Sequence, residues 1–279
     1  MRIEVGGLSF DVAVGGPGQG PPVLLLHGFP ESSRMWDGVV PLLHEAGLST
    51  IAPDQRGYSP GARPTEVSAY AIGEIVGDAL GLLDALDLPA VHVLGHDWGA
   101  VVGWHLAGRH PDRVRTFTAV SVPHPAAHAA AIQDDPEQQQ LSAYIRVFRE
   151  PEVAEAALLA EDARRLRRIF QPLPADQVDV FVRPLTEEGA LTAVLNWYRA
   201  MRRQDSTELG PVGVPTTYVW GTEDSGVARA AAEGCAAYVT GEFEFVELSG
   251  VSHWAPEEVP ETVARHALAR IAGQRAAPQ

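Results

Sequence analysis

The 279-residue sequence contains no lysine and only one cysteine, Cys235. A single cysteine cannot form an intrachain disulfide, and a lone thiol favours a reducing compartment, so we expect a cytoplasmic location. Every basic side chain is an arginine, and the formal net charge is −15. Because this charge repels phosphate backbones and anionic lipid surfaces, neither nucleic acid nor a membrane is expected as a partner.

Long apolar runs are also missing. No stretch approaches the roughly 18 residues needed to span a bilayer, and the start of the chain, Met1 to Gly7, lacks the apolar segment of a secretion signal. Apolar residues make up 46% and charged residues 20%, which is ordinary for a globular enzyme. The length suits one core domain with an insertion, which needs no disulfide or metal to fold. Absence of lysine beside abundant Ala, Gly and Pro is typical of a GC-rich bacterial genome.

Strand-like and helix-like segments alternate, which predicts helices packed on a mostly parallel sheet. The expected strands cover residues 2–5, 8–14, 23–27, 48–53, 91–94, 116–122, 214–220 and 243–248. The expected helices outside the insertion cover residues 35–45, 72–86, 99–109, 228–239 and 260–271. Residues 123–211 are helical in pattern and broken by prolines, so we interpret them as a helical lid inserted into a core of residues 1–122 and 212–279.

A tight turn between a buried strand and a helix carries the most informative motif, Gly95-His96-Asp97-Trp98-Gly99. Its spacing, small-x-nucleophile-x-small, is that of a nucleophile turn, with aspartate where serine is more common. A carboxylate is ionised at neutral pH and can attack a saturated carbon, which makes an ester of the aspartate itself. On this pattern alone, Asp97 could instead serve only as the cap of the following helix.

The remaining parts of the machinery follow other strands. In the loop His27-Gly28-Phe29-Pro30-Glu31, the backbone N–H of Phe29 is expected to form an oxyanion hole with that of Trp98. His253 is the expected base and Asp224 the acid that orients it, with Glu223 as the fallback. Both follow strands at the carboxyl edge, where ligands bind in open α/β sheets. His96 is expected near the site and His124 at the start of the lid. The remaining histidines are expected to be structural or at the surface: His44, His92, His105, His110, His128 and His266.

Taken together, the motifs resemble those of the α/β-hydrolase-fold epoxide hydrolases of the soluble type, over nearly the whole chain. The segments that carry the resemblance are residues 27–31, 54–58, 95–99, 121–125 and 250–254, with lid segments 144–154 and 195–199. The resemblance implies an α/β-hydrolase fold, in which a mostly parallel eight-stranded sheet is flanked by helices and carries a helical cap. It also implies that two lid tyrosines, Tyr144 and Tyr198, hold and protonate the epoxide oxygen. His96, Pro30 and Trp197 are expected to bind the substrate.

The function expected from this resemblance is conversion of a hydrophobic epoxide and water into a vicinal diol. Asp97 attacks an epoxide carbon, and His253, steered by Asp224, then activates the water that cleaves the ester. The partner is a small molecule, no metal or organic cofactor is needed, and a homodimer is compatible with the sequence.

Three other functions fit the sequence less well. Haloalkane and haloacetate dehalogenases use the same aspartate ester, but haloalkane enzymes often carry asparagine where Phe29 stands. Haloacetate enzymes usually place an arginine after the nucleophile, where Trp98 stands, and a His-Trp pair where the lid has Ala143-Tyr144. Ester, lactone or amide hydrolysis would be expected to use serine. A binding protein that retained the fold would be expected to lack part of the catalytic set, which is complete here.

Overall fold

The computed structural model describes residues 1–276, the last three of them by backbone alone. Eight strands form one sheet in the order β1-β2-β4-β3-β5-β6-β7-β8. Strand β2 runs antiparallel to both of its neighbours, and all pairs from β4 across to β8 are parallel. The strands are β1 (Arg2–Val5), β2 (Leu8–Gly15), β3 (Pro22–Leu26), β4 (Ser49–Pro53), β5 (Val91–His96), β6 (Val114–Val120), β7 (Thr216–Glu223) and β8 (Phe243–Ser252).

Helices connect the parallel strands, as the alternating sequence pattern predicts. The α-helices of the core are α1 (Val40–Glu45), α2 (Ile72–Ala85), α3 (Trp98–Arg109), α11 (Arg229–Gly234), α12 (Ala255–Glu258) and α13 (Pro260–Ala276). Short 3₁₀ helices are η1 (Ser33–Gly38), η2 (Pro60–Ala62), η3 (Val67–Tyr70), η4 (Pro111–Arg113) and η5 (Cys235–Tyr238). The expected fold class, a mostly parallel eight-stranded sheet flanked by helices, is confirmed.

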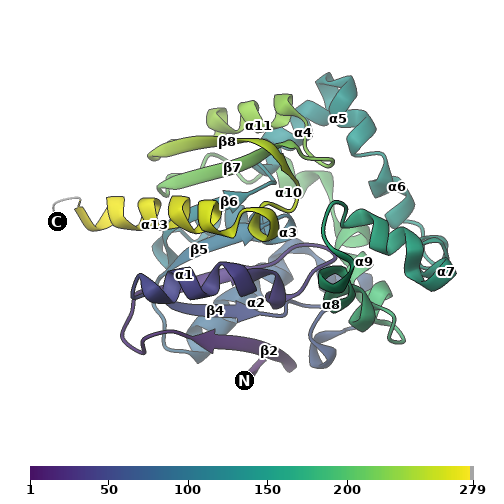
Figure 1. Ribbon diagram of the computed structural model, residues 1–279, viewed down its shortest axis with the longest axis horizontal. Helices are drawn as coiled ribbons and strands as arrows, with labels where there is room; N and C mark the ends of the chain where they lie inside the picture. The colour runs from purple at the N-terminus through teal and green to yellow at the C-terminus, as the bar shows by residue number, and fades with distance from the viewer. Residues whose placement is uncertain (277–279) are drawn as a thin grey trace.

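Both faces of the sheet are buried, and side chains of β3 show how. Leu24 and Leu26 pack into a cluster with α2 and α3, whereas Val23 and Leu25 pack into a cluster with α1 and α13. Successive side chains of a strand point to opposite faces, so an all-apolar strand is what burial on both faces requires. Figure 1 shows α1 and α13 in front of the sheet and α3 behind it.

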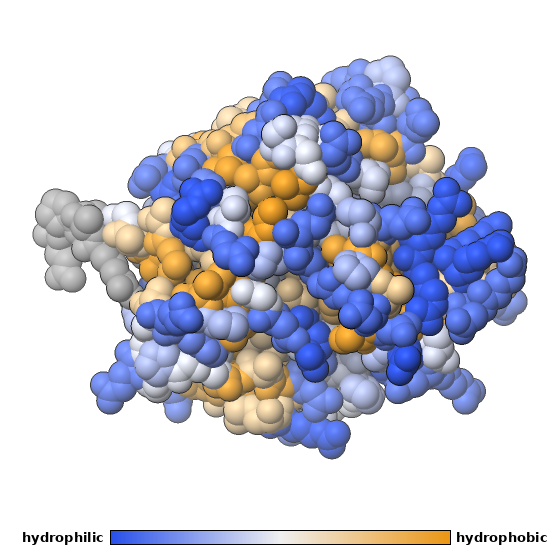
Figure 2. Space-filling model, viewed as in Figure 1, coloured by the Kyte–Doolittle hydropathy of each residue, from blue (hydrophilic) through white to orange (hydrophobic). Residues whose placement is uncertain are grey.

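Between β6 and β7 the chain leaves the sheet for a run of helices. These are α4 (Pro125–Asp134), α5 (Pro136–Leu141), α6 (Tyr144–Phe148), α7 (Val153–Ile169), α8 (Ala175–Leu185), α9 (Ala190–Ala200) and α10 (Arg203–Thr207). Figure 1 shows α6 to α9 gathered at one end of the sheet rather than on either face. In Figure 2 the outer surface at this end is mostly hydrophilic, while apolar side chains of these helices point inward into one of the core clusters.

Two expected helices are divided. The expected helix over residues 35–45 is η1 followed by α1, and Pro41 stands in the first turn of α1. Proline has no N–H to donate to a preceding turn, so it starts a helix and cannot continue one. The expected helix over residues 228–239 is likewise α11 followed by η5.

Candidate active site

The expected nucleophile occupies the turn between β5 and α3. Asp97 has φ 50° and ψ −119°, a conformation that non-glycine residues rarely adopt, and its side chain forms no cap to the helix. The turn depends on Gly99, because a Cβ there would lie 2.0 Å from the carbonyl oxygen of Leu26. The backbone at Asp97 is therefore strained to present the carboxylate, which disfavours the helix-cap interpretation.

The carboxylate of Asp97 is held from two sides. The backbone N–H of Phe29 donates to its Oδ1 at 2.8 Å, and Nε2 of His253 lies 3.5 Å from its Oδ2. Gly28 makes the first contact possible, because a Cβ there would lie 2.3 Å from that of Asp97. Trp98 is the first residue of α3, so its N–H has no acceptor within the helix and remains available beside the carboxylate.

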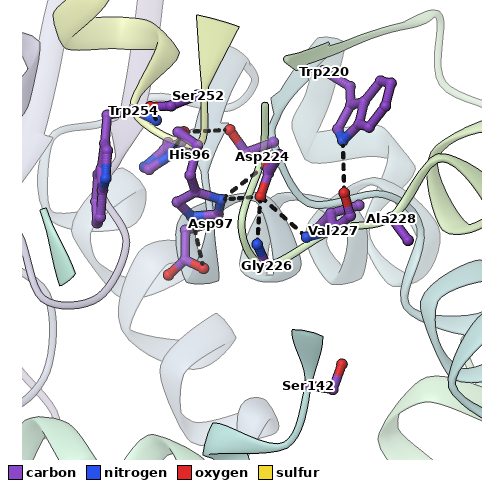
Figure 3. Close-up of polar contacts among 12 residues, drawn as sticks. His96, Asp97, Ser142, Trp220, Asp224, Gly226, Val227, Ala228, Ser252 and Trp254 are labelled. Carbon is purple, nitrogen blue, oxygen red and sulfur yellow. Dashed lines mark hydrogen bonds and ion pairs between the residues drawn. The ribbon is translucent and has the colours of Figure 1, made fainter. Parts of the chain in front are cut away.

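Asp224 orients His253. Its two carboxylate oxygens each lie 2.9 Å from Nδ1 of His253, which donates to them. The backbone N–H groups of Gly226 and Val227 donate to Oδ1 of Asp224 at 2.8 and 3.0 Å, and Figure 3 shows the carboxylate between these groups and the imidazole. Glu223 is exposed. Of the two acids considered from the sequence, Asp224 is therefore the one in contact with the histidine.

The pKa values of Asp97 and His253 are shifted in opposite directions. Burial alone raises the pKa of Asp97, but the hydrogen bond and charge of His253, with the N–H of Phe29, outweigh it and hold this pKa below its ordinary value. Burial likewise lowers the pKa of His253, but Asp224 and Asp97 outweigh it and raise this pKa well above its ordinary value. The resting site is thus a carboxylate–imidazolium pair.

Tyr144 and Tyr198 line the same cavity as Asp97. Tyr144 begins α6, Tyr198 lies on α9, and their ring centroids are 6.1 Å apart. Tyr198 is also packed edge-on against Phe29 and Trp98. Tyr198 is buried and Tyr144 is 39% exposed. Loss of solvent contact, with the charge of Asp97, raises the pKa of each phenol above its ordinary value, so both hydroxyls carry a proton at neutral pH.

The cavity has two arms that meet at four of the residues described above. Asp97, His253, Tyr144 and Tyr198 line both arms. The first arm, about 850 Å³ with the solvent at its mouth included, extends beneath α9 and beside α3. The second runs past Phe29, Phe148 and Trp254 toward the exposed Arg168.

The three residues expected to bind substrate divide between the cavity and the interior. Trp197 lines the first arm, and its Nε1 donates to the carbonyl of Arg56. Pro30 and His96 do not appear among the described residues that line either arm, and both are buried. A cavity-bound substrate would therefore meet Trp197 but not these two residues.

His96 instead belongs to a polar network behind His253. Its Nε2 donates to the carbonyl of His253 at 2.9 Å, and its Nδ1 lies 2.8 Å from Oε2 of Glu31. Burial lowers the pKa of His96, raises that of Glu31 to about 7, and raises that of the adjoining Glu257 well above its ordinary value. A neutral His96 that donates from Nε2 must accept at Nδ1, so protonated Glu31 is the donor.

Sequence reasoning missed several of these groups. Glu257 is adjacent to Glu258, and nothing in the sequence shows which of the two points inward. His105 and His128 were expected to be structural or at the surface, yet both line the first arm of the cavity. For His105 a signal existed: it stands seven residues after Trp98, on the face of α3 that continues from the nucleophile.

Within residues 1–276, no group of three or more His, Cys, Asp or Glu side chains is placed to hold a metal ion. None of the helices in that range has the length and apolar character to cross a membrane.

Comparison with known proteins decides the family. The family described as "alpha/beta hydrolase fold" matches residues 21–260. The chain belongs to that family. Epoxide hydrolase A of Mycobacterium tuberculosis is 32% identical, over 97% of this chain and 96% of its own length. The AB hydrolase superfamily protein YfhM of Bacillus subtilis is 34% identical, over 94% of this chain and 93% of its own length.

Solved structures agree. The epoxide hydrolase of Bacillus megaterium, in complex with an inhibitor, superposes with a TM-score of 0.88 at 26% identity, covering 98% of this chain and all of that one. Epoxide hydrolase A of Mycobacterium thermoresistibile gives 0.83 at 28% identity, with 98% of each chain covered. The resemblance to α/β-hydrolase-fold epoxide hydrolases, first indicated by the motifs, is thereby confirmed, and the chain is an enzyme of the hydrolase class.

Proposed function

We propose that this enzyme converts an epoxide and water into a vicinal diol through a covalent ester on Asp97. The observation that carries the proposal is the position of an ionised carboxylate opposite two protonated phenols in one cavity. A carboxylate is a nucleophile for a saturated carbon, and paired phenols suit an oxygen that becomes an alkoxide. The names of the relatives support the same substrate class.

In the first half of the reaction, an oxygen of Asp97 attacks one ring carbon and forms the ester C–O bond. The bond from that carbon to the epoxide oxygen breaks, and its electron pair stays on the oxygen. Tyr144 and Tyr198 donate to this oxygen and supply its proton. A buried alkoxide without donors would be strongly disfavoured, so both hydroxyls lower this barrier.

The second half follows from the change in charge. Esterification removes the negative charge of Asp97, which is one of the two interactions that raise the pKa of His253. The imidazolium therefore becomes more acidic once the ester forms, and its proton returns to the tyrosinate that ring opening left, so His253 can act as a base toward water. His253 takes a proton from water, the hydroxide adds to the ester carbonyl, and the N–H groups of Phe29 and Trp98 hold the oxyanion. The C–O bond to the diol then breaks, the proton of the added hydroxyl passes to the diol oxygen, and the diol departs, which leaves the Asp97 carboxylate beside protonated His253.

Residues 123–211 form the lid in this proposal. Helices α6 and α9 bring the two tyrosines over the nucleophile, and the cavity between lid and sheet is lined largely by apolar side chains. Such a cover excludes water from the first step, in which water would compete with Asp97. Residues 1–122 and 212–279 then form the core that carries Asp97, Asp224 and His253.

The proposal is tested by trapping the ester. The His253→Gln variant, incubated with styrene oxide, should accumulate added mass on the peptide that contains Asp97, while the wild-type enzyme should not. The incubation is run at mildly alkaline pH, because the variant also loses the interaction that holds the pKa of Asp97 down. No adduct on that peptide, or halide released from a short bromoalkane by a wild-type enzyme that forms no diol, would contradict the proposal.

A further inference from the structure

The first arm of the cavity follows one face of helix α3 away from the nucleophile. Trp98, Val101 and His105 line this arm and stand three and four residues apart, which places them in a row along the helix. At a rise of about 1.5 Å per residue, the row extends roughly 10 Å beyond the turn that carries Asp97. The arm therefore has room for a substituent about two helical turns long.

The walls of this arm are apolar for most of that length. Ile72 and Ile75 of α2 line one side, and Val122, Pro125 and Met201 line others. A substituent that fills this part of the arm must itself be apolar, because these side chains offer no hydrogen bond.

The far end of the arm is different. His105 is 1% exposed, and its Nδ1 is enclosed without a hydrogen-bond partner among the described residues. His128 and Ser206 also line the arm and form no side-chain hydrogen bond within residues 1–276, but both are partly exposed. Buried polar groups are nearly always paired in native proteins, so the enclosed, unpaired Nδ1 of His105 indicates a ligand that pairs with it.

The charge at this end restricts the ligand. Burial lowers the pKa of both His105 and His128 to about 4, so at neutral pH each ring offers one N–H donor and one acceptor. Asp205 lies at the same end of the arm, and both of its carboxylate oxygens are taken by Arg202. Neutral rings beside a carboxylate favour a group that both donates and accepts, and they offer nothing to balance an anion.

We propose that the distal end of this arm, formed by His105 with His128 and Ser206, is a subsite for a neutral hydroxyl group on the substrate. The substrate class is then an epoxide whose apolar substituent, about 10 Å long, ends in a hydroxyl. The inference rests on the proposed function of the cavity, whose catalytic end it leaves unchanged. Burying the hydroxyl against unpaired polar groups gives selectivity that an apolar pocket cannot, because the analogue lacking it leaves those groups unsatisfied.

The test compares terminal epoxides on a ten-carbon chain with a methyl, a hydroxyl or a carboxylate at the far end. The wild-type enzyme should favour the hydroxyl over the methyl compound by about tenfold or more in kcat/KM, as one buried hydrogen bond predicts. His105→Leu should bring this ratio close to one, whereas His105→Asn, whose amide nitrogen can occupy the position of Nδ1, should keep part of it. His110→Leu, just beyond the end of α3 and outside the cavity lining, is the matched control and should keep the full ratio.

Equal kcat/KM for the hydroxyl and methyl compounds in the wild-type enzyme would overturn the inference, as would an undiminished ratio in His105→Leu or a preference for the carboxylate. The same comparison is made without chemistry by calorimetric binding of the three corresponding diols to Asp97→Ala. If no epoxide is turned over, the proposed function fails, while the binding ratio still decides the subsite.

Discussion

Asp97 combines a strained backbone with a carboxylate that His253 and the N–H of Phe29 hold ionised. The strain is tolerated because Gly99 lets the helix approach the sheet and Gly28 lets the Phe29 N–H reach the carboxylate. At this scale the proposed reaction depends on the loss of the negative charge of Asp97 when the ester forms. A resting carboxylate–imidazolium pair becomes a neutral ester beside a histidine that is free to act as a base.

The two phenols are each expected to contribute to ring opening, and the reaction should need at least one of them. Tyr144→Phe or Tyr198→Phe should each lower kcat/KM for styrene oxide by about 10²-fold, because one donor to the developing alkoxide is lost. The double variant should lose diol formation altogether. Steady-state kinetics measures the loss, and circular dichroism checks that the fold is intact; undiminished turnover in the double variant would mean that another group protonates the oxygen.

Asp224 should matter chiefly in the second half-reaction. Asp224→Asn keeps the size of the side chain but loses the charge that raises the pKa of His253, so ester hydrolysis should slow by about 10²–10⁴-fold. Rapid-quench kinetics should show a burst of ester followed by slow diol release. Glu223→Gln, at the exposed neighbouring position, is the matched control and should behave as wild type. Loss of activity in the control with none in Asp224→Asn would reverse the assignment of the acid.

At the scale of elements, α9 makes polar contacts with the loop that follows β4 and with α7. Trp197 donates to the carbonyl of Arg56, and Arg199 forms a two-pronged ion pair with Glu155 of α7 at 2.8 and 2.9 Å. The side chains of this pair are 6% and 16% exposed. Since Tyr198 lies between these two anchors, its aim at the nucleophile depends on both.

Removing the ion pair between Arg199 and Glu155 should weaken the packing of α9 against α7. Arg199→Ala removes this ion pair and leaves Glu155 with only the hydroxyl of Thr192 as a hydrogen-bond donor, so we expect a loss of about 2 kcal/mol in the free energy of unfolding and a higher KM. Chemical denaturation and steady-state kinetics measure the two effects. Arg164→Ala is the matched control, because its ion pair with Glu161 is exposed and should contribute little. Equal losses in both variants would show that the Arg199 pair has no special role.

Several elements could be predicted from the sequence because their signals are local. The all-apolar strand patterns predict β3 and β5, and the spacing of Gly95 and Gly99 predicts the turn that carries Asp97. The order of Asp97, Asp224 and His253 predicts which strand ends lie next to one another. Residue 41 shows the limit: a proline inside an apolar helical pattern could begin a new helix or end an old one. The roles of Glu31 and Glu257 could not be predicted, because burial of a polar side chain depends on elements distant in the sequence.

At the scale of the whole molecule, the buried carboxyl groups set how stability depends on pH. The folded-state pKa of Glu257 is raised well above its ordinary value, so the stability it contributes is complete below about pH 4.5 and declines as the pH rises through the raised pKa. Two carboxylates cannot both be charged side by side without solvent. Glu257 therefore keeps its proton in the folded chain beside Glu31, and the fold loses stability when that proton leaves.

The Glu257→Gln variant should remove this dependence, because the amide keeps a donor and does not titrate. Its melting temperature should match that of the wild type near pH 4.5 and exceed it by a few degrees at alkaline pH, about the shift that 1 kcal/mol gives a chain of this size. Differential scanning calorimetry across this range measures the difference. Glu261→Gln, at an exposed position in the first turn of α13, should show no such divergence. A constant difference at all pH values would count against a protonated Glu257 in the folded chain.

The covalent ester on Asp97 is the central claim, and one turnover in water enriched in oxygen-18 tests it most directly. With enzyme in excess over styrene oxide, the ester mechanism transfers an oxygen of Asp97 to the diol and replaces it from the solvent. We therefore predict an unlabelled diol and a heavy oxygen in the peptide that contains Asp97, read by mass spectrometry. A labelled diol with an unlabelled peptide would mean that water attacks the epoxide directly, and it would contradict the account.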